Sequence, residues 1–557
     1  MKRWNGWGDV NHTYPFPPSA ADYLTTLVGE GTSYPDAALE SVIASVPPSQ
    51  IPEQPLITTD AEQRLYHARG QSLPDWIALR SGRIGAFPDG VAYPASAEEV
   101  RTLLQFARRT ETQLIPYGGG TSVVGHINPL PGGRPVLTVD LSRLNRLEYL
   151  DQTSRLATFG AGVTGPYLEA QLRPFNLTLG HFPQSFEYST LGGWIATRSS
   201  GQQSYYYGRI ESLFAGGQIE TPLDSLQIAP HPASAAGPDL RELILGSEGR
   251  LGIITQATVR VRPIPESETF QAAFFHDWAS GVKAVREIAQ DGIPVSMLRL
   301  NNAQETETTL ALAGKEQLVA WADRGLRLLC YGPERCLLLF GLTGEQPLTK
   351  TAEKMTKAII RANGGLPTGG TIGRLWEKAR FDTPYLRNTL WEAGYAIDTL
   401  ETAVPWDAVH DTAADIQTAI NQAIVDTGER VLILTHLSHV YNDGASIYVT
   451  YLFRRTADPE QLLHRWQAMK SAASQAIVAH KGTISHQHGV GIDHAPYLTA
   501  EIGELGIEWL SAMCKTADPD GMLNPGKLLP AQDNGQTRGE SQEVSHVDTR
   551  LAPQAVD

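Results

Sequence analysis

The stretch PYGGGTSVVG, from Pro116 to Gly125, decides how the rest of the sequence is interpreted. An apolar strand pattern leads into three consecutive glycines and then two hydroxyl residues, Thr121 and Ser122. Without Cβ atoms, the backbone can turn sharply and direct several N–H groups into one concavity, which suits a pyrophosphate. A tight loop without a ligand is the alternative, but three adjacent glycines are entropically costly in a simple connector.

The residues around this loop predict a mixed α/β unit between about residues 78 and 265. Upstream, GVAYPASAEEVRTLLQFARRTETQLIPY indicates a strand, a helix and a strand, with apolar side chains at helical spacing from Val100 to Ala107. Downstream, PVLTVDL, LATFGAG and GIITQATVRVRP are expected to form strands and GPYLEAQLR a short helix. The loop therefore connects elements of one domain.

The remaining sequence divides into four segments by composition. Residues 1–77 are rich in Pro, Ser and Thr and predict an irregular arm with short helices. Residues 266–484 mix strands such as VLILTHLSHV and SIYVTYLF with amphipathic helices, which indicates a second α+β unit. Residues 485–530 end in a helix and a turn, and the polar residues 531–557 are expected to be disordered.

Composition excludes several classes of protein. The 557 residues carry a net charge of −15, which argues against a non-specific nucleic-acid binder. No apolar run approaches the roughly 20 residues that span a bilayer, and the N-terminus lacks the pattern of a signal peptide. The sparse cysteines, Cys330, Cys336 and Cys514, predict buried free thiols and no zinc site. We therefore expect a soluble cytoplasmic protein.

Further glycine-rich segments follow the first loop. GAGVTG, from Gly160 to Gly165, matches a dinucleotide fingerprint, but the next helix is short and Glu187 follows no clean second strand, so NAD is not favoured. The long stretch GHFPQSFEYSTLGGWIATRSSGQQSYYYGRIE and the segment ILGSEGRLGIITQATVRV also combine glycines with polar residues. A long loop inside a compact domain is usually functional.

In order and spacing, these segments resemble the FAD-binding domain of the vanillyl-alcohol-oxidase (PCMH-type) flavoprotein superfamily. The resemblance implies an α+β fold, with an FAD-binding domain of two subdomains and an antiparallel-sheet cap domain with flanking helices. The glycine loop contains no His for covalent attachment, so non-covalent FAD is expected. The implied FAD contacts are Pro116, Tyr117, Gly118, Gly119, Gly120, Thr121, Ser122, Gln184, Ser185, Phe186, Glu187, Tyr188, Ser189, Thr190, Thr197, Arg198, Ser199, Ser200, Glu248, Gly249, Arg250, Leu251, Gly252, Ile253 and Ile254.

Other motifs narrow the resemblance and cover about residues 5–530. WNGWGD, VSMLRLNN, PYLRNTL, DTLETAVPW, YNDGASIYVTYLF and SHQHGVG are similar to segments of the alkyldihydroxyacetonephosphate synthase family. This resemblance implies replacement of the acyl chain of acyl-dihydroxyacetone phosphate by a fatty alcohol, in ether-lipid synthesis and without net redox change. It also implies a fatty tunnel, peripheral contact with a membrane surface and, by analogy, a homodimer.

The same resemblance assigns roles to individual residues. Tyr448 matches the family's catalytic tyrosine, Arg299 an arginine needed for activity, and Arg387 an arginine that contacts the substrate. A phenol can relay a proton, and a guanidinium fork suits a phosphate. Without the family, Tyr448 would be interpreted as a strand tyrosine and each arginine as ion-paired or solvated.

His486 and His488 match the outer two of three consecutive histidines in the family, and both are expected to be catalytic. Gln487 stands where the family has the middle histidine, and glutamine cannot take up a proton near neutral pH. This departure puts the synthase activity in question but leaves FAD binding untouched. Without the family, both histidines would be interpreted as loop caps.

Two other functions remain open. The first is an FAD-dependent D-2-hydroxy-acid dehydrogenase, whose relatives hold a metal with two histidines and a glutamate. His439 would supply one of these ligands, but Tyr448 and Gln487 stand in place of the others, so no metal is expected. The second is a non-catalytic flavin-binding protein, which would not need Tyr448, Arg299 and Arg387.

Overall fold

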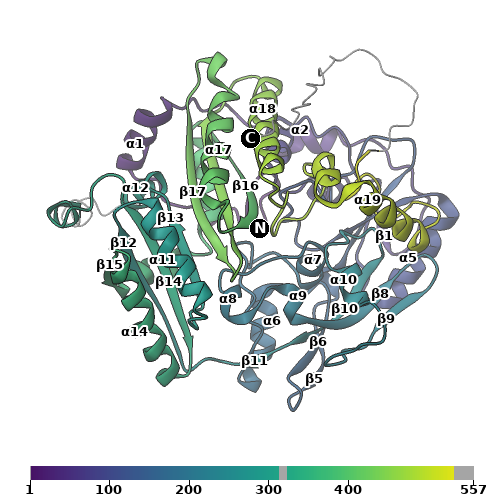
Figure 1. Cartoon of the computed structure of the whole chain (residues 1–557). Coiled ribbons are helices and arrows are strands. Elements are labelled where there is room, and N and C mark those ends of the chain that lie inside the picture. The colour runs from purple at the N-terminus through teal and green to yellow at the C-terminus, as the bar shows by residue number, and fades with distance from the viewer. Residues whose placement is uncertain (1, 313–322, 532–557) are drawn as a thin grey trace, which may run out of the picture.

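The computed structural model describes residues 2–312 and 323–531, which form sheets of four, five and seven strands and one two-stranded ribbon. The two smaller sheets lie together, and the seven-stranded sheet stands beside them (Figure 1). The predicted α+β fold, with two small subdomains and an antiparallel cap, is confirmed. From residue 532 onward, the tail predicted to be disordered lies outside the described residues.

The four-stranded sheet carries the glycine loop at the end of β3. Its order is β1-β2-β4-β3, with β2, β4 and β3 parallel. Helix α5 covers it because Ser96 caps the first turn and the apolar stripe from Val100 to Ala107 is buried. The elements are β1 Ile57–Thr58, β2 Gly90–Ala92, α5 Ala97–Thr110, β3 Gln113–Tyr117 and β4 Val136–Asp140.

The five-stranded sheet is antiparallel, in the order β5-β6-β10-β8-β9. In GAGVTG, a Cβ on Gly162 would lie 1.8 Å from the carbonyl oxygen of Leu141, so close packing explains this glycine without NAD. The elements are β5 Leu147–Asp151, β6 Leu156–Gly160, α6 Gly165–Leu172, β7 Leu177–Thr178, α7 Leu191–Ala196, α8 Ser204–Tyr207, α9 Ile210–Leu213, β8 Phe214–Glu220, β9 Ser225–Ile228, α10 Leu240–Ile244, β10 Ile253–Arg260 and β11 Arg262–Pro263.

The cap sheet is antiparallel throughout, in the order β15-β12-β14-β13-β17-β18-β16. Helices α11 and α14 lie along this sheet (Figure 1). Alternate residues divide between its faces, because Leu338 packs with α11 and α14 in one hydrophobic cluster and Leu339 belongs to another. The elements are β12 Ser267–Phe275, α11 Trp278–Gln290, β13 Met297–Asn301, α12 Ala303–Leu312, β14 Cys336–Gly344, α14 Gln346–Ala362, β15 Leu366–Gly369, α15 Gly370–Ala379, α16 Thr383–Glu392, β16 Tyr395–Pro405, α17 Val409–Gln422, β17 Val431–Val440, β18 Gly444–Arg454 and α18 Pro459–Ala479.

The N-terminal segment is more ordered than predicted. It forms α1 Pro18–Val28, α2 Leu39–Ala44, α3 Ala61–Tyr66 and α4 Leu73–Ser81, and its strand β1 joins the first sheet. The boundary predicted after residue 77 falls inside α4. A capping box of Ser72 and Asp75 starts this helix, and Gly82, whose backbone is in the left-handed conformation, ends it.

The C-terminal segment returns to the first sheet after helix α19, Leu498–Ala517. Leu523 forms a parallel bridge with Leu114 of β3, so the end of the described chain extends the sheet at its β3 edge. Of the cysteines predicted to be buried, Cys336 and Cys514 are, whereas Cys330 is exposed in a turn. Within residues 2–312 and 323–531, no helix has the length and apolar character needed to cross a membrane.

Candidate active site

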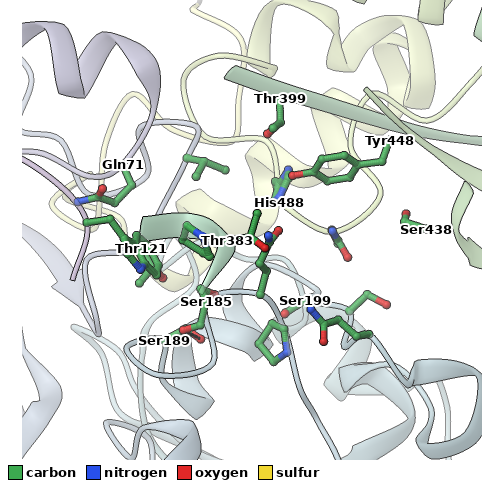
Figure 2. A pocket seen from close by; sticks show the side chains of 18 of the residues that line it. Gln71, Thr121, Ser185, Ser189, Ser199, Thr383, Thr399, Ser438, Tyr448 and His488 are labelled. Atoms are coloured by element: carbon green, nitrogen blue, oxygen red, sulfur yellow. Dashed lines mark hydrogen bonds between the residues drawn. The ribbon is translucent and has the colours of Figure 1, made fainter. Parts of the chain in front are cut away.

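One cavity of about 1050 Å³ lies where the two smaller sheets, the cap sheet and the C-terminal segment meet. Its volume is at the upper end of the roughly 300–1,000 Å³ typical of ligand pockets. Polar side chains from the first two sheets and from the cap converge on it (Figure 2). Tyr448, Arg299, Arg387 and His488 are in its wall, so the cavity joins residues that are far apart in the sequence.

The glycine loop forms a cradle of backbone amides at one end of the cavity. A Cβ on Gly119 would lie 1.8 Å from the carbonyl oxygen of Tyr188, and one on Gly118 would lie 2.2 Å from Oγ1 of Thr190. In the described part of the chain, the amides of residues 119–122 donate to no other group. These residues line the cavity and offer several amides without a protein acceptor, so this loop fits an anionic ligand.

Most of the predicted FAD contacts line the cavity. Every residue from Pro116 to Ser122 does so, and the others are Gln184, Ser185, Ser189, Thr190, Thr197, Ser199, Ser200, Glu248, Gly249, Gly252 and Ile254. Gln71, His126 and Asn524 also line it and were missed by the sequence analysis. His126 directly follows the glycine-loop motif and lies 2.8 Å from Oγ of Ser122, whereas distant contacts bring Gln71 and Asn524 to the cavity.

Three residues predicted to contact FAD lie outside the cavity wall, in the turn at residues 186–188. Phe186 stacks on Phe381, with ring centroids 5.1 Å apart. The hydroxyl of Tyr385 donates to Glu187 at 3.0 Å and lies 3.0 Å from the hydroxyl of Tyr188. The turn therefore holds the FAD-binding domain against helix α16, and contact of these three residues with FAD stays a prediction.

Four more residues predicted to contact FAD also lie outside the cavity wall. Arg198 forms a surface ion pair with Glu242 at 2.6 Å, and Arg250 donates to a backbone carbonyl of the C-terminal segment at 2.6 Å. Leu251 and Ile253 are buried in the hydrophobic cores of the two smaller sheets. Successive residues of an extended segment point to opposite sides, so a contiguous motif cannot supply a ligand contact at every position.

Tyr448, on the cap strand β18, directs its hydroxyl toward His488 and Thr399 (Figure 2). Its ring stacks on His436, with centroids 5.0 Å apart, and meets His488 edge-on at 5.9 Å. Burial raises the pKa of the phenol above its ordinary value, and the neighbouring charge of Glu401 adds to the effect. The hydroxyl therefore keeps its proton at neutral pH and can donate it.

Glu401 fixes the loop that carries His488. Its fully buried carboxylate accepts the backbone N–H groups of Gln487 at 2.6 Å and of His488 at 2.9 Å. Nδ1 of His488 lies 3.3 Å from the same carboxylate. Burial lowers the pKa of His488, although Glu401 opposes this shift, so the imidazole is neutral near pH 7. His488 can therefore accept a proton beside Tyr448.

His486 does not line the cavity, although it was predicted to be catalytic. Its ring lies behind the wall, where Nε2 is 2.5 Å from the hydroxyl of Tyr441 and the ring stacks on His439. His439 lines the cavity, and its Nε2 is 2.9 Å from Oε1 of Gln487. Successive loop residues diverge in direction, which explains why His488 reaches the cavity and His486 does not.

Arg299 belongs to a polar bridge in which Glu305 of helix α12 joins strands β13 and β17. It donates to Glu305 at 2.7 Å, and the other oxygen of Glu305 lies 3.0 Å from Nδ1 of His436. Burial alone would raise the pKa of Glu305, but the charges of His436 and Arg299 lower it to about 2. An ionised carboxylate only accepts hydrogen bonds, so His436 donates from Nδ1. Arg299 is thus held in place by a charged partner.

Arg387, on helix α16, lines the cavity without an ion pair in the described part of the chain. Its guanidinium lies 4.4 Å from the ring centroid of Trp76 and donates to the backbone oxygen of Gln71. The Nε and Nη2 atoms are buried and have no acceptor. Burial lowers its pKa to about 10, so the cation persists at neutral pH. Unpaired buried donors favour an anionic ligand.

The cavity continues into an apolar region that the sequence analysis implied only through the family resemblance. Strand β17 places Leu432, Leu434 and His436 in the wall at every second residue, and β18 does the same with Tyr448 and later positions. This alternation in the sequence could have predicted that one face of each strand lines the cavity. Contributions from α1, such as Leu24, could not be foreseen because α1 packs against α12 and the cap strands only in the folded chain.

Comparisons with known proteins agree with this architecture. An alkyldihydroxyacetonephosphate synthase from Dictyostelium discoideum is 30% identical over 95% of this chain and 93% of its own length. The chain belongs to the alkyldihydroxyacetonephosphate synthase family. A solved structure of an alkyldihydroxyacetonephosphate synthase matches with a TM-score of 0.81 at 28% identity, covering 95% of this chain and 99% of the other.

The broader likenesses are weaker. Family models for an FAD binding domain and for the C-terminal domain of FAD linked oxidases match residues 88–223 and 264–528. A cytochrome-type mitochondrial D-lactate dehydrogenase from Arabidopsis thaliana is 25% identical over 92% of this chain and 85% of its own length. Among the residues that the structure describes, no group of three His, Cys, Asp or Glu side chains could hold a metal ion.

FAD is the cofactor of this family member. The structure fits it, because the free amides of residues 119–122 suit a diphosphate and the adjoining cavity is large enough for a flavin nucleotide. Hydroxyl-bearing residues at 184–200 and Glu248 continue the same wall. Glu248 also accepts the backbone N–H of Gly491 at 2.9 Å, which ties the FAD-binding domain to the loop of His488.

Proposed function

We propose that this protein exchanges the acyl chain of acyl-dihydroxyacetone phosphate for a fatty alcohol and so forms an alkyl ether lipid precursor. The observation that carries the proposal is a single cavity in which an amide cradle, the unpaired Arg387 and a long apolar wall adjoin Tyr448. A small hydroxy acid would not need the apolar wall. Family membership points to the same chemistry.

The reaction balances without an oxidant. The bond between C1 and the ester oxygen breaks, and the fatty acid leaves as a carboxylate that retains the bonding electrons. The alcohol oxygen forms the new bond to C1, and its proton is released. When bound, FAD would supply the reactive isoalloxazine ring at which this exchange takes place. The residues of the chain must then hold the phosphate, exclude water and move protons at C1.

The residues suit these tasks as follows. Arg387 would bind the substrate phosphate, because its guanidinium has buried donors without acceptors. Tyr448, whose pKa is raised by burial, would donate a proton at C1, and neutral His488 would accept one. Arg299 would contribute a cation that Glu305 keeps in position. Gln487 would hold His439 by a hydrogen bond and would not titrate itself.

Fatty substrates reside in bilayers, so the proposal includes peripheral contact with a membrane surface. It also includes a cytoplasmic location and, by analogy with the family, a homodimer.

The central experiment incubates FAD-loaded protein with palmitoyl-dihydroxyacetone phosphate and hexadecanol. Mass spectrometry should detect the hexadecyl ether product and palmitate in equal amounts. Absence of ether together with bleaching of the flavin by D-lactate would instead establish a D-2-hydroxy-acid dehydrogenase.

A further inference from the structure

The cavity-facing side of the cap sheet carries two separate apolar clusters. One, named the α16 pocket, is built on β17, β18, α1 and α16, and the other, named the α15 pocket, is built on β13, β14 and α15. The α16 pocket contains Leu24, Leu386, Leu390, Leu432 and Leu452, all of which line the cavity. The α15 pocket contains Met297, Leu337, Leu339, Ile372 and Trp376, which also line it.

The bridge of Arg299, Glu305 and His436 separates the two pockets. Arg299 is on β13 and His436 on β17, the two strands that meet between the clusters in the strand order. All three side chains are in the cavity wall, joined by contacts of 2.7 and 3.0 Å. Laying an apolar chain across these charged groups would remove water from them without compensation. One fatty chain is therefore not expected to occupy both pockets.

An arginine stands beside each pocket. Arg387 follows Leu386 on α16, and Arg380 directly follows the last residue of α15. Arg380 forms no ion pair within residues 2–312 and 323–531, although its Nη1 donates to Oε1 of Gln203 at 3.0 Å. Aromatic rings surround its guanidinium carbon at 4.9 to 6.0 Å, namely those of Phe182, Phe270, Trp376 and Phe381.

The exchange involves two fatty chains, and only one of the chains leaves as an anion. We propose that the α15 pocket with Arg380 binds the departing fatty acid, and that the α16 pocket binds the chain of the entering alcohol. Arg380 would pair with the carboxylate released from C1, while the neutral alcohol needs no cation. This inference rests on the proposed function and adds to it separate sites for the two chains.

A purely structural role for Arg380 makes a different prediction. If the guanidinium only holds the surrounding rings together, Arg380→Gln should lower thermal stability and weaken every ligand alike. If it binds a carboxylate, the loss should be confined to fatty acids. Arg380→Lys retains the charge without the planar fork and should recover part of the affinity for fatty acid.

The test measures binding of palmitate and hexadecanol to the FAD-loaded protein by calorimetry, each alone and each in the presence of the other. Wild type should bind both at once. Arg380→Gln should weaken palmitate about tenfold, as expected for loss of one charge-assisted contact, and leave hexadecanol within about twofold. Leu339→Trp should obstruct palmitate, whereas the matched change Leu452→Trp should obstruct hexadecanol.

Competition between palmitate and hexadecanol for one site in wild type would overturn the inference. So would equal losses of both ligands in Arg380→Gln, or unchanged palmitate binding in that variant while it retains its flavin and melting temperature. Because the binding measurements require no turnover, failure of the proposed function can be distinguished from failure of the second fatty site. If wild type forms no ether product, the proposed function fails, whereas ether formation with palmitate binding unaffected by Arg380→Gln removes only the second fatty site.

Discussion

Tyr448 and Glu401 lie directly opposite each other on the neighbouring strands β18 and β16. The carboxylate of Glu401 adds to the burial that raises the pKa of the Tyr448 phenol. The same carboxylate accepts the amides of Gln487 and His488. One buried acid therefore adds to the raised pKa of the tyrosine and holds the histidine loop beside it. The proton donor and the proton acceptor thus both contact Glu401 or its strand.

Glu401→Gln should disrupt this support. The amide oxygen can still accept both backbone N–H groups, which bind the same oxygen of Glu401, but the NH₂ replaces the other buried oxygen and the negative charge is lost. Weakening charge-assisted hydrogen bonds costs about 1.5–3 kcal/mol, so we expect a lower free energy of unfolding and slower ether formation. Urea denaturation and product analysis would measure both. Glu429→Gln, at an ion pair with Arg454, is the control and should leave the rate unchanged.

Tyr448→Phe should abolish most of the exchange while leaving FAD bound. The ring still packs on His436, but the proton of the phenol is lost, and general acid catalysis is worth about 10²-fold or more. Flavin absorbance would report the cofactor, and mass spectrometry the ether. Tyr395→Phe removes a hydroxyl that donates to the carbonyl of Gly29 outside the cavity, and it should retain the rate. An active Tyr448→Phe enzyme would refute the assigned role.

Gly119→Ala should weaken FAD binding. The new Cβ would lie 1.8 Å from a backbone oxygen, so the cradle must shift, and overpacking of this kind costs about 1–3 kcal/mol. If that strain falls on the bound state, the dissociation constant of FAD rises about ten- to hundredfold. Equilibrium dialysis would measure it. Gly132→Ala, where no atom lies within 4 Å of the added Cβ, should bind FAD normally.

Stability should fall in acid because several histidines are buried in the neutral form. Burial lowers the pKa of His181 and of His439 to about 3 from the ordinary 6.5. Below about pH 6.5 the unfolded chain binds protons that the folded chain refuses, so each contributes a loss of up to about 1.4 kcal/mol per pH unit. Urea denaturation between pH 7 and pH 5, with the free energy of unfolding extrapolated linearly to zero urea, would test this.

His181→Gln should make that pH dependence shallower, since one buried histidine is removed. His464→Gln, at an exposed position on α18, should leave the slope unchanged. A slope that is the same in His181→Gln as in wild type would show that His181 already takes up its proton in the folded protein. Comparing slopes avoids any dependence on the absolute stability of either variant.

The sequence predicted the features that depend on local geometry. Three glycines after a strand indicated the amide cradle, and the helix over residues 97–110 was visible in its cap and apolar spacing. Features that depend on distant pairing could not be predicted. Glu401 reaches the loop of His488 only because β16 pairs with β18, and Arg380 approaches the FAD-binding domain only through the packing of α15. Glu401 falls within the family motif DTLETAVPW, but that motif does not show which loop its carboxylate contacts, and Arg380 carries no recognisable local pattern.

The contiguous motifs also contain more residues than line the cavity. Phe186, Arg250 and Ile253 fall within segments that face the cavity, yet their side chains pack elsewhere. His486 was assigned with His488 because they share a motif, although the backbone directs them apart. The family resemblance correctly located segments on the cavity, whereas assignment of single residues required coordinates.

The bridge between Leu114 and Leu523 has a consequence for synthesis of the chain. Ribosomes release the N-terminal end first, so β3 and its glycine loop emerge while the segment that covers their outer edge is still hundreds of residues from being made. Asn524, which lines the same cavity, arrives with it. A nascent chain therefore exposes an open sheet edge and an incomplete flavin pocket until translation has almost finished, and the finished pocket can form only after the cap has been made.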